Sequence, residues 1–576
     1  MKQTRFHLFG SLALAAIVAS CGSLDKMKEA AKQISYKVTP EVLETHAGKV
    51  PMAFKANVPA KMWDKKVVAE ITPVLTYEGG ETVYPSITVN GESVADNTNQ
   101  TISYTNGGQI DYKQQSVDFN DKMRVSDLIV RIKFTRGEES FEITSKELEM
   151  PAIAKGVIAT STLLGDEAGV PALGKDAFQR VMTDAKVAEL VYLINKADIR
   201  NGQLKKDDVK AINDYIKTVK EAENMNLKDV VVSAYASPDG ATDLNTNLAS
   251  KREASAKDYI TKQLNKAKAE ANVVTKSTPE DWEGFKAAME KSDIQDKDLI
   301  LRVLSMYTDP DVREKEIKNL SAAYKVIAEE ILPPLRRSQI SVNAELVGKS
   351  DDQLKELAIS NPDSLNVEEL LYAATLFNGD AEKQAKVYES AAKIYSNDWR
   401  AVNNYGIVLY NNGNVAGAKA QFQAAEKIQA TPEVENNLGV IAIAEKDFAA
   451  AKEYFGKAAG VGSELDDNLG IIALLEGDYA KAEEYFGAST SLNAALCKIL
   501  VEKYDAALGL LNANNQEVGL KYYLKAICGA RKGEADLIFE NLRKAVNLDS
   551  KWKEYAKTDM EFYKYLSNAT FTAILD

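Results

Sequence analysis

The spacing of apolar positions changes along the chain, and a period of two comes first. Between about residues 35 and 152, apolar and polar residues alternate, as in SDLIVRIKFTRGEESFEI. One face of that stretch carries Leu128, Val130, Ile132 and Phe134. Glycine-containing turn signals recur at short spacing, for example Asn90-Gly91. Alternation predicts half-buried strands, and hairpins at this spacing predict a small β-sandwich over residues 35–152.

A mixed rhythm of strands and helices follows. Two stretches have the period of amphipathic helices, KKDDVKAINDYIKTVKEAE and NTNLASKREASAKDYITKQL. Three others are predicted to be strands: VAELVYLINKADI, KDVVVSAYAS and ANVVTKS. LRRSQISVNAEL is expected to be the last strand, after a helical insert between about residues 277 and 334. We expect an α+β domain over residues 153–347, with a mixed sheet and helices on one face.

The remainder, residues 348–576, is helical and repeats itself. NNYGIVLY, NNLGVIAIA and DNLGIIALL contain the marker glycines Gly406, Gly439 and Gly470, separated by 33 and 31 residues. An alanine follows each glycine by 12 residues and a phenylalanine by 16: Ala418, Ala451 and Ala482; Phe422, Phe455 and Phe486. This pattern resembles the tetratricopeptide repeat, which implies an all-α solenoid of helix pairs whose concave surface binds peptides or proteins. We expect the glycine and alanine to let the two helices approach, and the phenylalanine to fill the interface with the next pair.

Two degenerate copies are expected to follow the three clear repeats. The first lies around Tyr504 and Ala507, and the second contains Gly533 and Ala545.

The N-terminus has the features of an export signal. Lys2 and Arg5 precede an uncharged apolar run, and Cys21 follows in VASCGS. The run is too short to span a bilayer, so residues 1–20 are expected to be a signal peptide. VASCGS resembles the cleavage box of bacterial lipoproteins, which implies that Cys21 is lipidated and that several acyl chains hold the protein stably. Residues 21–34 would then be the anchor and tether, and the resemblance implies the outer membrane, facing the periplasm.

Charge and rare residues narrow the function classes. Loss of the signal takes the net charge from −13 to −15, so an acidic chain without a basic block is not expected to bind nucleic acid. Cys497 and Cys528 either pair or are buried free thiols. His46 is the one histidine after the signal, which leaves no histidine pair for a metal and no Ser-His-Asp unit away from it. We therefore expect a protein that is not an enzyme and has no metal or cofactor.

The stretch VVSAYASPDGATDLNTNLASKREASAKDYI holds the candidate binding site. It lacks the Gly-Lys-Ser ending and the glycine spacing of a phosphate loop. Turn chemistry explains Asp239, and we expect Asp243 to cap the following helix. Arg252 is either a solvated helix residue or a group that points back at the turn.

The order of these motifs resembles the OmpA-like peptidoglycan-binding domain. The resemblance rests on VVVSAYASPDG, on the spacing of Asn245, Leu248 and Arg252, and on the Arg336-Arg337 pair before the last strand. In that family an aspartate at the strand end and the helix arginine hold the diaminopimelate of the peptidoglycan stem peptide. Arg252 and Asn245 match family positions, but Ser237 stands where the aspartate is expected, and Asp239 is the residue that could replace it. An arginine suits a carboxylate, because a two-pronged charge-assisted hydrogen bond contributes about 1.5–3 kcal/mol.

We therefore expect a multidomain outer-membrane lipoprotein that binds peptidoglycan through Arg252, Ser237, Asp239 and Asn245. Its repeats would bind periplasmic or outer-membrane proteins. The alternative is an accessory subunit of an outer-membrane assembly or secretion machine, in which the OmpA-like domain no longer binds the cell wall.

Overall fold

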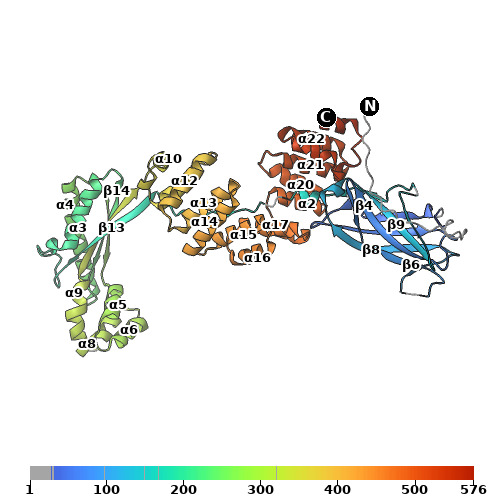
Figure 1. Ribbon diagram of the computed structural model, residues 1–576. Coiled ribbons are helices and arrows are strands. Elements are labelled where there is room, and N and C mark those ends of the chain that lie inside the picture. The colour runs from blue at the N-terminus through green and yellow to red at the C-terminus, as the bar shows by residue number, and fades with distance from the viewer. Residues whose placement is uncertain (1–26, 29–30, 96–97, 148, 166–167, 320) are drawn as a thin grey trace. The chain divides into compact units, whose positions relative to one another are not determined.

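The computed structural model describes residues 27–28, 31–95, 98–147, 149–165, 168–319 and 321–576, which form two compact units (Figure 1). The first unit combines residues up to 174 with residues 396–576, and the second contains residues 175–395. Cys21 and the signal lie outside the described residues.

The N-terminal part of the first unit is built from β-sheets, as the alternation predicts. One sheet has the order β1-β3-β8, and a larger one has the order β10-β9-β4-β6-β7, with β5 and β11 attached to its strands. The strands of these two sheets are β1 (Ser35–Thr39), β3 (Lys49–Val58), β4 (Val68–Tyr77), β5 (Gly80–Val83), β6 (Ile87–Gly91), β7 (Gln100–Ile102), β8 (Gly108–Asp118), β9 (Ser126–Arg136), β10 (Glu139–Thr144) and β11 (Ala154–Lys155). A short parallel pair, β2 (Leu43–Glu44) and β12 (Val157–Ile158), and helix α2 (Thr160–Leu163) complete this part.

Alternate residues of both sheets turn inward into one core. On β3, Met52 and Phe54 are buried, and on β9 Leu128 and Phe134 are buried. Phe54 stacks on Tyr112 of β8 with ring centroids 4.9 Å apart. The inward face of each strand therefore follows from its period of two.

The helices of the first unit form consecutive antiparallel pairs. They are α13 (Trp399–Asn411), α14 (Val415–Ile428), α15 (Pro432–Ala444), α16 (Phe448–Lys457), α17 (Ser463–Leu475), α18 (Tyr479–Phe486), α19 (Leu492–Leu500), α20 (Tyr504–Ala513), α21 (Gly519–Lys532), α22 (Ala535–Leu548), α23 (Lys551–Lys557) and α24 (Ala569–Leu575). The second helix of each clear repeat begins at an asparagine or aspartate cap, namely Asn414, Asp447 and Asp478.

The marker glycines lie where the two helices of a pair cross. A Cβ at Gly439 would lie 2.3 Å from Cε1 of Phe455, and Gly406 and Gly470 face Phe422 and Phe486 in the same way. Each phenylalanine therefore packs against the glycine of its own pair, and Phe422 shares a core cluster with residues of α15 in the next pair. In the last copy the crossing glycine is Gly529, whose Cβ would lie 3.0 Å from Ile538; Gly533 instead ends α21 in the left-handed region.

The second unit contains a four-stranded mixed sheet of order β13-β16-β14-β15, in which only the β14–β15 pairing is parallel. Its strands are β13 (Val181–Val191), β14 (Met225–Tyr235), β15 (Asn272–Thr278) and β16 (Arg337–Val347). Helices α3 (Asp207–Glu221) and α4 (Thr242–Ala267) pack on the sheet and share one core with it (Figure 1). The predicted strands and helices of this region are therefore present in the predicted order.

The insert between β15 and β16 is helical and has its own small core around Phe285, Met289 and Ile327. Its helices are α5 (Trp282–Lys291), α6 (Lys297–Met306), α7 (Pro310–Asn319), α8 (Ser321–Val326) and α9 (Leu332–Leu335). Helices α10 (Asp351–Ser360), α11 (Val367–Thr375) and α12 (Ala381–Ile394) follow β16 and belong to the same unit.

The compact units divide the chain differently from the sequence periods. Residues 153–174 belong with the β-rich part, and α10–α12 belong with the mixed sheet. In the stretch expected to be a tether, Met27, Ala31 and Ile34 are buried in the β-rich core. The residues of this stretch that the structure describes are therefore part of the first unit.

Candidate functional site

The loop between β14 and α4 brings together two of the predicted site residues. The Ser237 hydroxyl donates a hydrogen bond to Asp239, and the backbone N–H of Asp239 donates to the Ser237 carbonyl at 2.8 Å. Arg336, which lies between α9 and β16, donates to Ser237 Oγ at 3.2 Å and forms an ion pair with Asp239 at 3.0 Å. The side chains of Arg336 and Asp239 are 10% and 12% exposed, so this charge pair lies just below the surface.

Arg252 lies on the buried face of α4 and is 1% exposed. Arg252 is therefore not a solvated helix residue: its guanidinium donates to the Tyr235 carbonyl at the end of β14 at 2.9 Å, and to the carbonyls of Lys196 and Leu193 in the loop after β13 at 3.1 and 3.4 Å. Burial lowers the pKa of Arg252 to about 10, and repulsion from Arg336 adds to the shift while Tyr192 and Asp239 oppose it. Arg252 therefore stays charged at neutral pH and lies within electrostatic reach of the Asp239–Arg336 pair.

The other residues of the motif shape the loop. Asn245 is buried and donates from Nδ2 to the Gly240 carbonyl at 3.0 Å, which closes the turn onto the helix. The prediction that Asp243 caps α4 is wrong, because the cap position is Ala241 and Asp243 lies in the first turn. There its negative charge still suits the positive end of the helix.

The helical insert approaches the same loop. Pro238 lines a narrow apolar pocket with insert residues that include Trp282, Phe285 and Tyr324. Lys318 and Tyr324 are close enough for Asp239 to perturb the pKa of each. Asp239 therefore lies near the cations Arg336, Arg252 and Lys318, of which Lys318 is also paired with Glu314.

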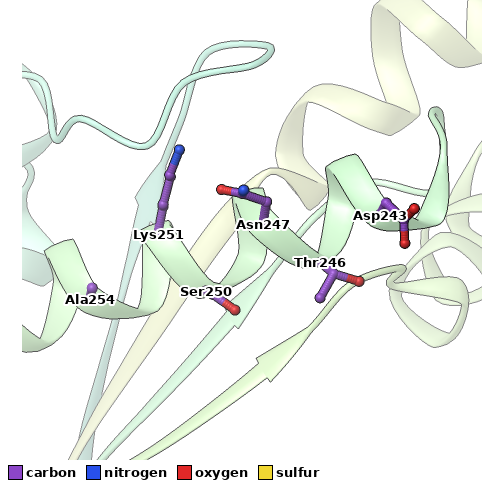
Figure 2. A pocket seen from close by; sticks show the side chains of 6 residues that line it. All are labelled: Asp243, Thr246, Asn247, Ser250, Lys251 and Ala254. Atoms are coloured by element: carbon purple, nitrogen blue, oxygen red, sulfur yellow. The ribbon is translucent and has the colours of Figure 1, made fainter.

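A shallow polar pocket of about 510 Å³ follows the outer face of α4 (Figure 2). Its lining residues recur at helical spacing: Asp243, Thr246, Asn247, Ser250, Lys251 and Ala254. This face lies away from the buried residues Asn245, Ala249 and Arg252.

A second candidate site lies on the first helices of the three clear repeats and was missed by the sequence analysis. Three asparagines stand two residues before the marker glycines and are at most 1% exposed: Asn404, Asn437 and Asn468. We call them the asparagine ladder. Each side-chain amide binds both backbone groups of one residue in the segment Gly169–Gly174, which we call the inner segment. Asn468 Oδ1 accepts from Val170 N at 2.6 Å and Nδ2 donates to Val170 O at 2.8 Å; Asn437 binds Ala172 at the same two distances. Asn404 binds Gly174 at 2.8 and 2.9 Å.

Neighbouring asparagines join the ladder into one network. Asn436 and Asn403 donate to the carbonyls of Val170 and Ala172 at 3.1 and 3.2 Å. Asn437 donates to Asn403 Oδ1 at 2.8 Å, and Asn468 donates to Asn436 Oδ1 at 3.0 Å. The signal in the sequence was the asparagine that recurs two residues before each marker glycine, in NNYG, NNLG and DNLG. A polar side chain that is buried at every repeat needs hydrogen-bond partners, and here the backbone of the inner segment supplies them.

A buried ion network connects the β-rich part of the first unit with its last helices. Arg531 forms ion pairs with Glu561 and Glu44, each at 2.6 Å, and Thr160 donates to Glu561 at 2.6 Å. Nearby, burial and the charge of Glu561 raise the pKa of Asp559 to about 6, while the Tyr523 hydroxyl donates to its carboxylate at 2.7 Å. These groups join elements of one unit.

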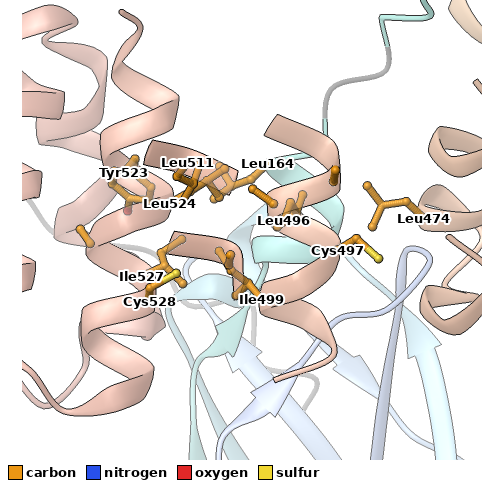
Figure 3. Close-up of a cluster of buried hydrophobic side chains, with 14 of the residues drawn as sticks. Leu164, Leu474, Leu496, Cys497, Ile499, Leu511, Tyr523, Leu524, Ile527 and Cys528 are labelled. Carbon is orange, nitrogen blue, oxygen red and sulfur yellow. The ribbon is translucent and has the colours of Figure 1, made fainter. Parts of the chain in front are cut away.

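Cys497 and Cys528 are free and buried among apolar side chains (Figure 3). Burial raises their pKa values to about 11 and about 12, so the protonated thiols are poor nucleophiles. His46 Nδ1 lies 2.8 Å from the Tyr479 hydroxyl. In the described part of the chain no group of three or more His, Cys, Asp or Glu residues could hold a metal ion. No helix within those residues is long and apolar enough to cross a membrane.

Neither a scan of protein-family models nor a search of curated proteins finds a match. Among solved structures, the chain is similar over 36% of its length to a tetratricopeptide repeat protein from Parabacteroides merdae, with 17% identity, 91% of that chain covered and a TM-score of 0.29. It is similar to Pseudomonas aeruginosa PilF over 36% of its length, with 16% identity, 99% of that chain covered and a TM-score of 0.28. The likeness to the Cut9–Hcn1 hetero-tetramer of the APC/C has 13% identity and a TM-score of 0.32, and covers 39% of this chain and 46% of that one. The assignment of tetratricopeptide-type helix pairs rests on the Gly–Phe crossings described above.

Proposed function

We propose that the protein is a non-enzymatic scaffold of the cell envelope that binds the diaminopimelate stem peptide of peptidoglycan at the loop after β14. Lipidation at Cys21 would attach it to the outer membrane, facing the periplasm, and its helical repeats would bind envelope proteins. The observation that carries the wall-binding part is the Asp239–Arg336 pair with Ser237 beside it and Arg252 below.

The chemistry of diaminopimelate suits this pair. Its free end carries one carboxylate and one ammonium, and the loop offers one cation and one anion 3.0 Å apart. A ligand carboxylate on Arg336 and a ligand ammonium on Asp239 would replace one internal ion pair with two. Ser237 would keep a hydrogen bond to either partner. Arg336 thereby takes the carboxylate-binding part that the family resemblance implies for Arg252, whose N–H groups bind backbone carbonyls.

Arg252 would then act as a positioning residue. Its bonds to Lys196, Leu193 and Tyr235 hold the loop after β13 against the end of β14. Its charge also favours an anion near Arg336, because the two arginines already repel each other.

A second candidate function is that of an accessory subunit of an outer-membrane assembly or secretion machine, without wall binding. The same geometry favours it in one respect, since Asp239 and Arg336 already neutralise each other and are nearly buried. The free energy gained on wall binding must therefore exceed the free energy needed to open this ion pair.

Co-sedimentation with purified diaminopimelate-type peptidoglycan distinguishes the two. We expect the protein without residues 1–21 to pellet with the wall, and free diaminopimelate to release it. Asp239→Asn and Arg336→Gln should each abolish pelleting, whereas Lys257→Ala, an exposed position of α4, should not change it. A folded wild-type protein that stays in the supernatant would favour the accessory-subunit function.

A further inference from the structure

The inner segment occupies the face of the repeats formed by α13, α15 and α17 as a bound peptide would. Its residues 170, 172 and 174 present their N–H and C=O groups to the asparagine ladder. Alternate residues of an extended chain point the same way and are about 6.6 Å apart along it. One asparagine per repeat therefore matches two residues of an extended peptide, which runs opposite to the order of the repeats.

The contacts select backbone and small side chains rather than a particular sequence. A Cβ at Gly169 would lie 2.9 Å from Val440 Cγ2, and one at Gly174 would lie 3.0 Å from Arg400 Cα. Ala172 is 3% exposed, whereas Leu173 is 37% exposed and lies between the ladder-bound residues Ala172 and Gly174. Pro171 stands between the bonded residues, at a position where the ladder needs no N–H group. Small residues at 169, 172 and 174 thus meet the requirement.

We propose that this face is a binding site for an extended segment of a partner protein, with small residues at these three positions, and that the inner segment is its built-in competitor. Backbone recognition tolerates different sequences, so any extended segment with this spacing can make the same six bonds. A tethered segment competes at an effective concentration on the order of millimolar. A partner with micromolar intrinsic affinity is thereby excluded until the inner segment is released. The proposal does not depend on peptidoglycan binding.

The test uses the full chain and a fluorescent peptide with the sequence of residues 168–176. Ala172→Pro removes the N–H that Asn437 accepts and leaves every groove residue in place. Its matched control is Leu173→Pro, which puts the same residue at a position outside the ladder, as Pro171 already is. We expect the Ala172→Pro protein to bind the peptide at least about tenfold more tightly than the wild type, and the control to match the wild type. Adding Asn437→Ala to Ala172→Pro should abolish the gain.

Two results would overturn the proposal. One is a folded Ala172→Pro protein that binds the peptide no better than the wild type, which would make the inner segment a permanent structural element. The other is a gain accompanied by concentration-dependent dimers, which would assign the face to exchange of the inner segment between copies. If Ala172→Pro does not fold, Gly169→Val releases the segment through its clash with Val440 and leaves the ladder intact. As a control, a peptide of residues 168–176 that itself carries Ala172→Pro lacks the N–H group for Asn437 and should bind neither the wild-type protein nor any of the variants.

Discussion

Truncating the central rung of the ladder, Asn437→Ala, gives the sharpest test of how the inner segment is held. Asn437 is 0% exposed; its Oδ1 accepts from Ala172 N and from Asn436 Nδ2, and its Nδ2 donates to Ala172 O and to Asn403 Oδ1. The alanine variant removes the donor of Asn403 Oδ1 and the acceptor of Ala172 N, while Ala172 O keeps its bond from Asn403 and Asn436 keeps its bond to Val170 O. Each buried group that loses its partner costs about 1–3 kcal/mol, so we expect the bound segment to lose roughly 2–6 kcal/mol.

Hydrogen exchange measures this loss directly. The Val170 and Gly174 amides keep their own asparagines in the variant, so faster exchange at these positions reports release of the whole segment. A loss of about 2 kcal/mol corresponds to roughly thirtyfold faster exchange. Asn541→Ala is the matched control, because Asn541 is a buried helical asparagine whose side chain donates only to Leu537 O of its own helix. Unchanged exchange at Val170 and Gly174 in Asn437→Ala would show that Asn437 does not hold the inner segment in place.

Three further predictions concern the stability and reactivity of the first unit. The pKa of Asp559 is raised from its usual 3.8 to about 6 in the folded state, so the folded state binds the extra proton. The stabilisation that this proton gives therefore falls as pH rises from about 4 to 6. Thermal melts of Asp559→Asn should lack this pH-dependent component, and a pH profile equal to that of the wild type would contradict the prediction. Gly439→Ala should lower the free energy of unfolding by about 1–3 kcal/mol, because its Cβ would overlap Phe455. Gly456→Ala, which has open space around it, should be neutral or slightly stabilising. Equal effects of the two substitutions would contradict the crossing geometry. Cys497 and Cys528 should react with a thiol reagent only after denaturation, and rapid labelling of the folded protein would show that they are accessible.

Hydrophobic periodicity predicted the strands and helices of each region in their correct order. The period of two predicted the strands around Phe54 and Phe134, and the spacing of Gly406, Gly439 and Gly470 predicted the helix pairs, because burial of one face determines both patterns. Periodicity could not predict the boundaries of the compact units. The segment from Gly169 to Gly174 has no polar side chain, so no alternation of polar and apolar residues marks a buried face, and its position depends on hydrogen bonds from residues more than 200 positions away.

The candidate sites were only partly predictable for a similar reason. The motif placed Ser237 and Asp239 in one loop, but the partner of Asp239 is Arg336, which comes from the far end of the insert. Arg252 fits the family spacing, yet its direction toward the carbonyls of Lys196 and Leu193 depends on the tertiary packing of the loop after β13. Sequence spacing identifies which residues share an element, whereas the charge balance of a site depends on which elements meet.

We propose that the loop after β14 recognises the zwitterionic end of diaminopimelate. Lysine differs from diaminopimelate there by the missing terminal carboxylate, so the most direct measurement is calorimetric titration with two stem tripeptides, one ending in diaminopimelate and the other in lysine. Because a charge-assisted bond to Arg336 contributes about 1.5–3 kcal/mol, we predict that the diaminopimelate peptide binds about ten- to a hundred-and-fiftyfold more tightly. Equal affinity for the two peptides, or no binding of either by the folded protein, would contradict the claim.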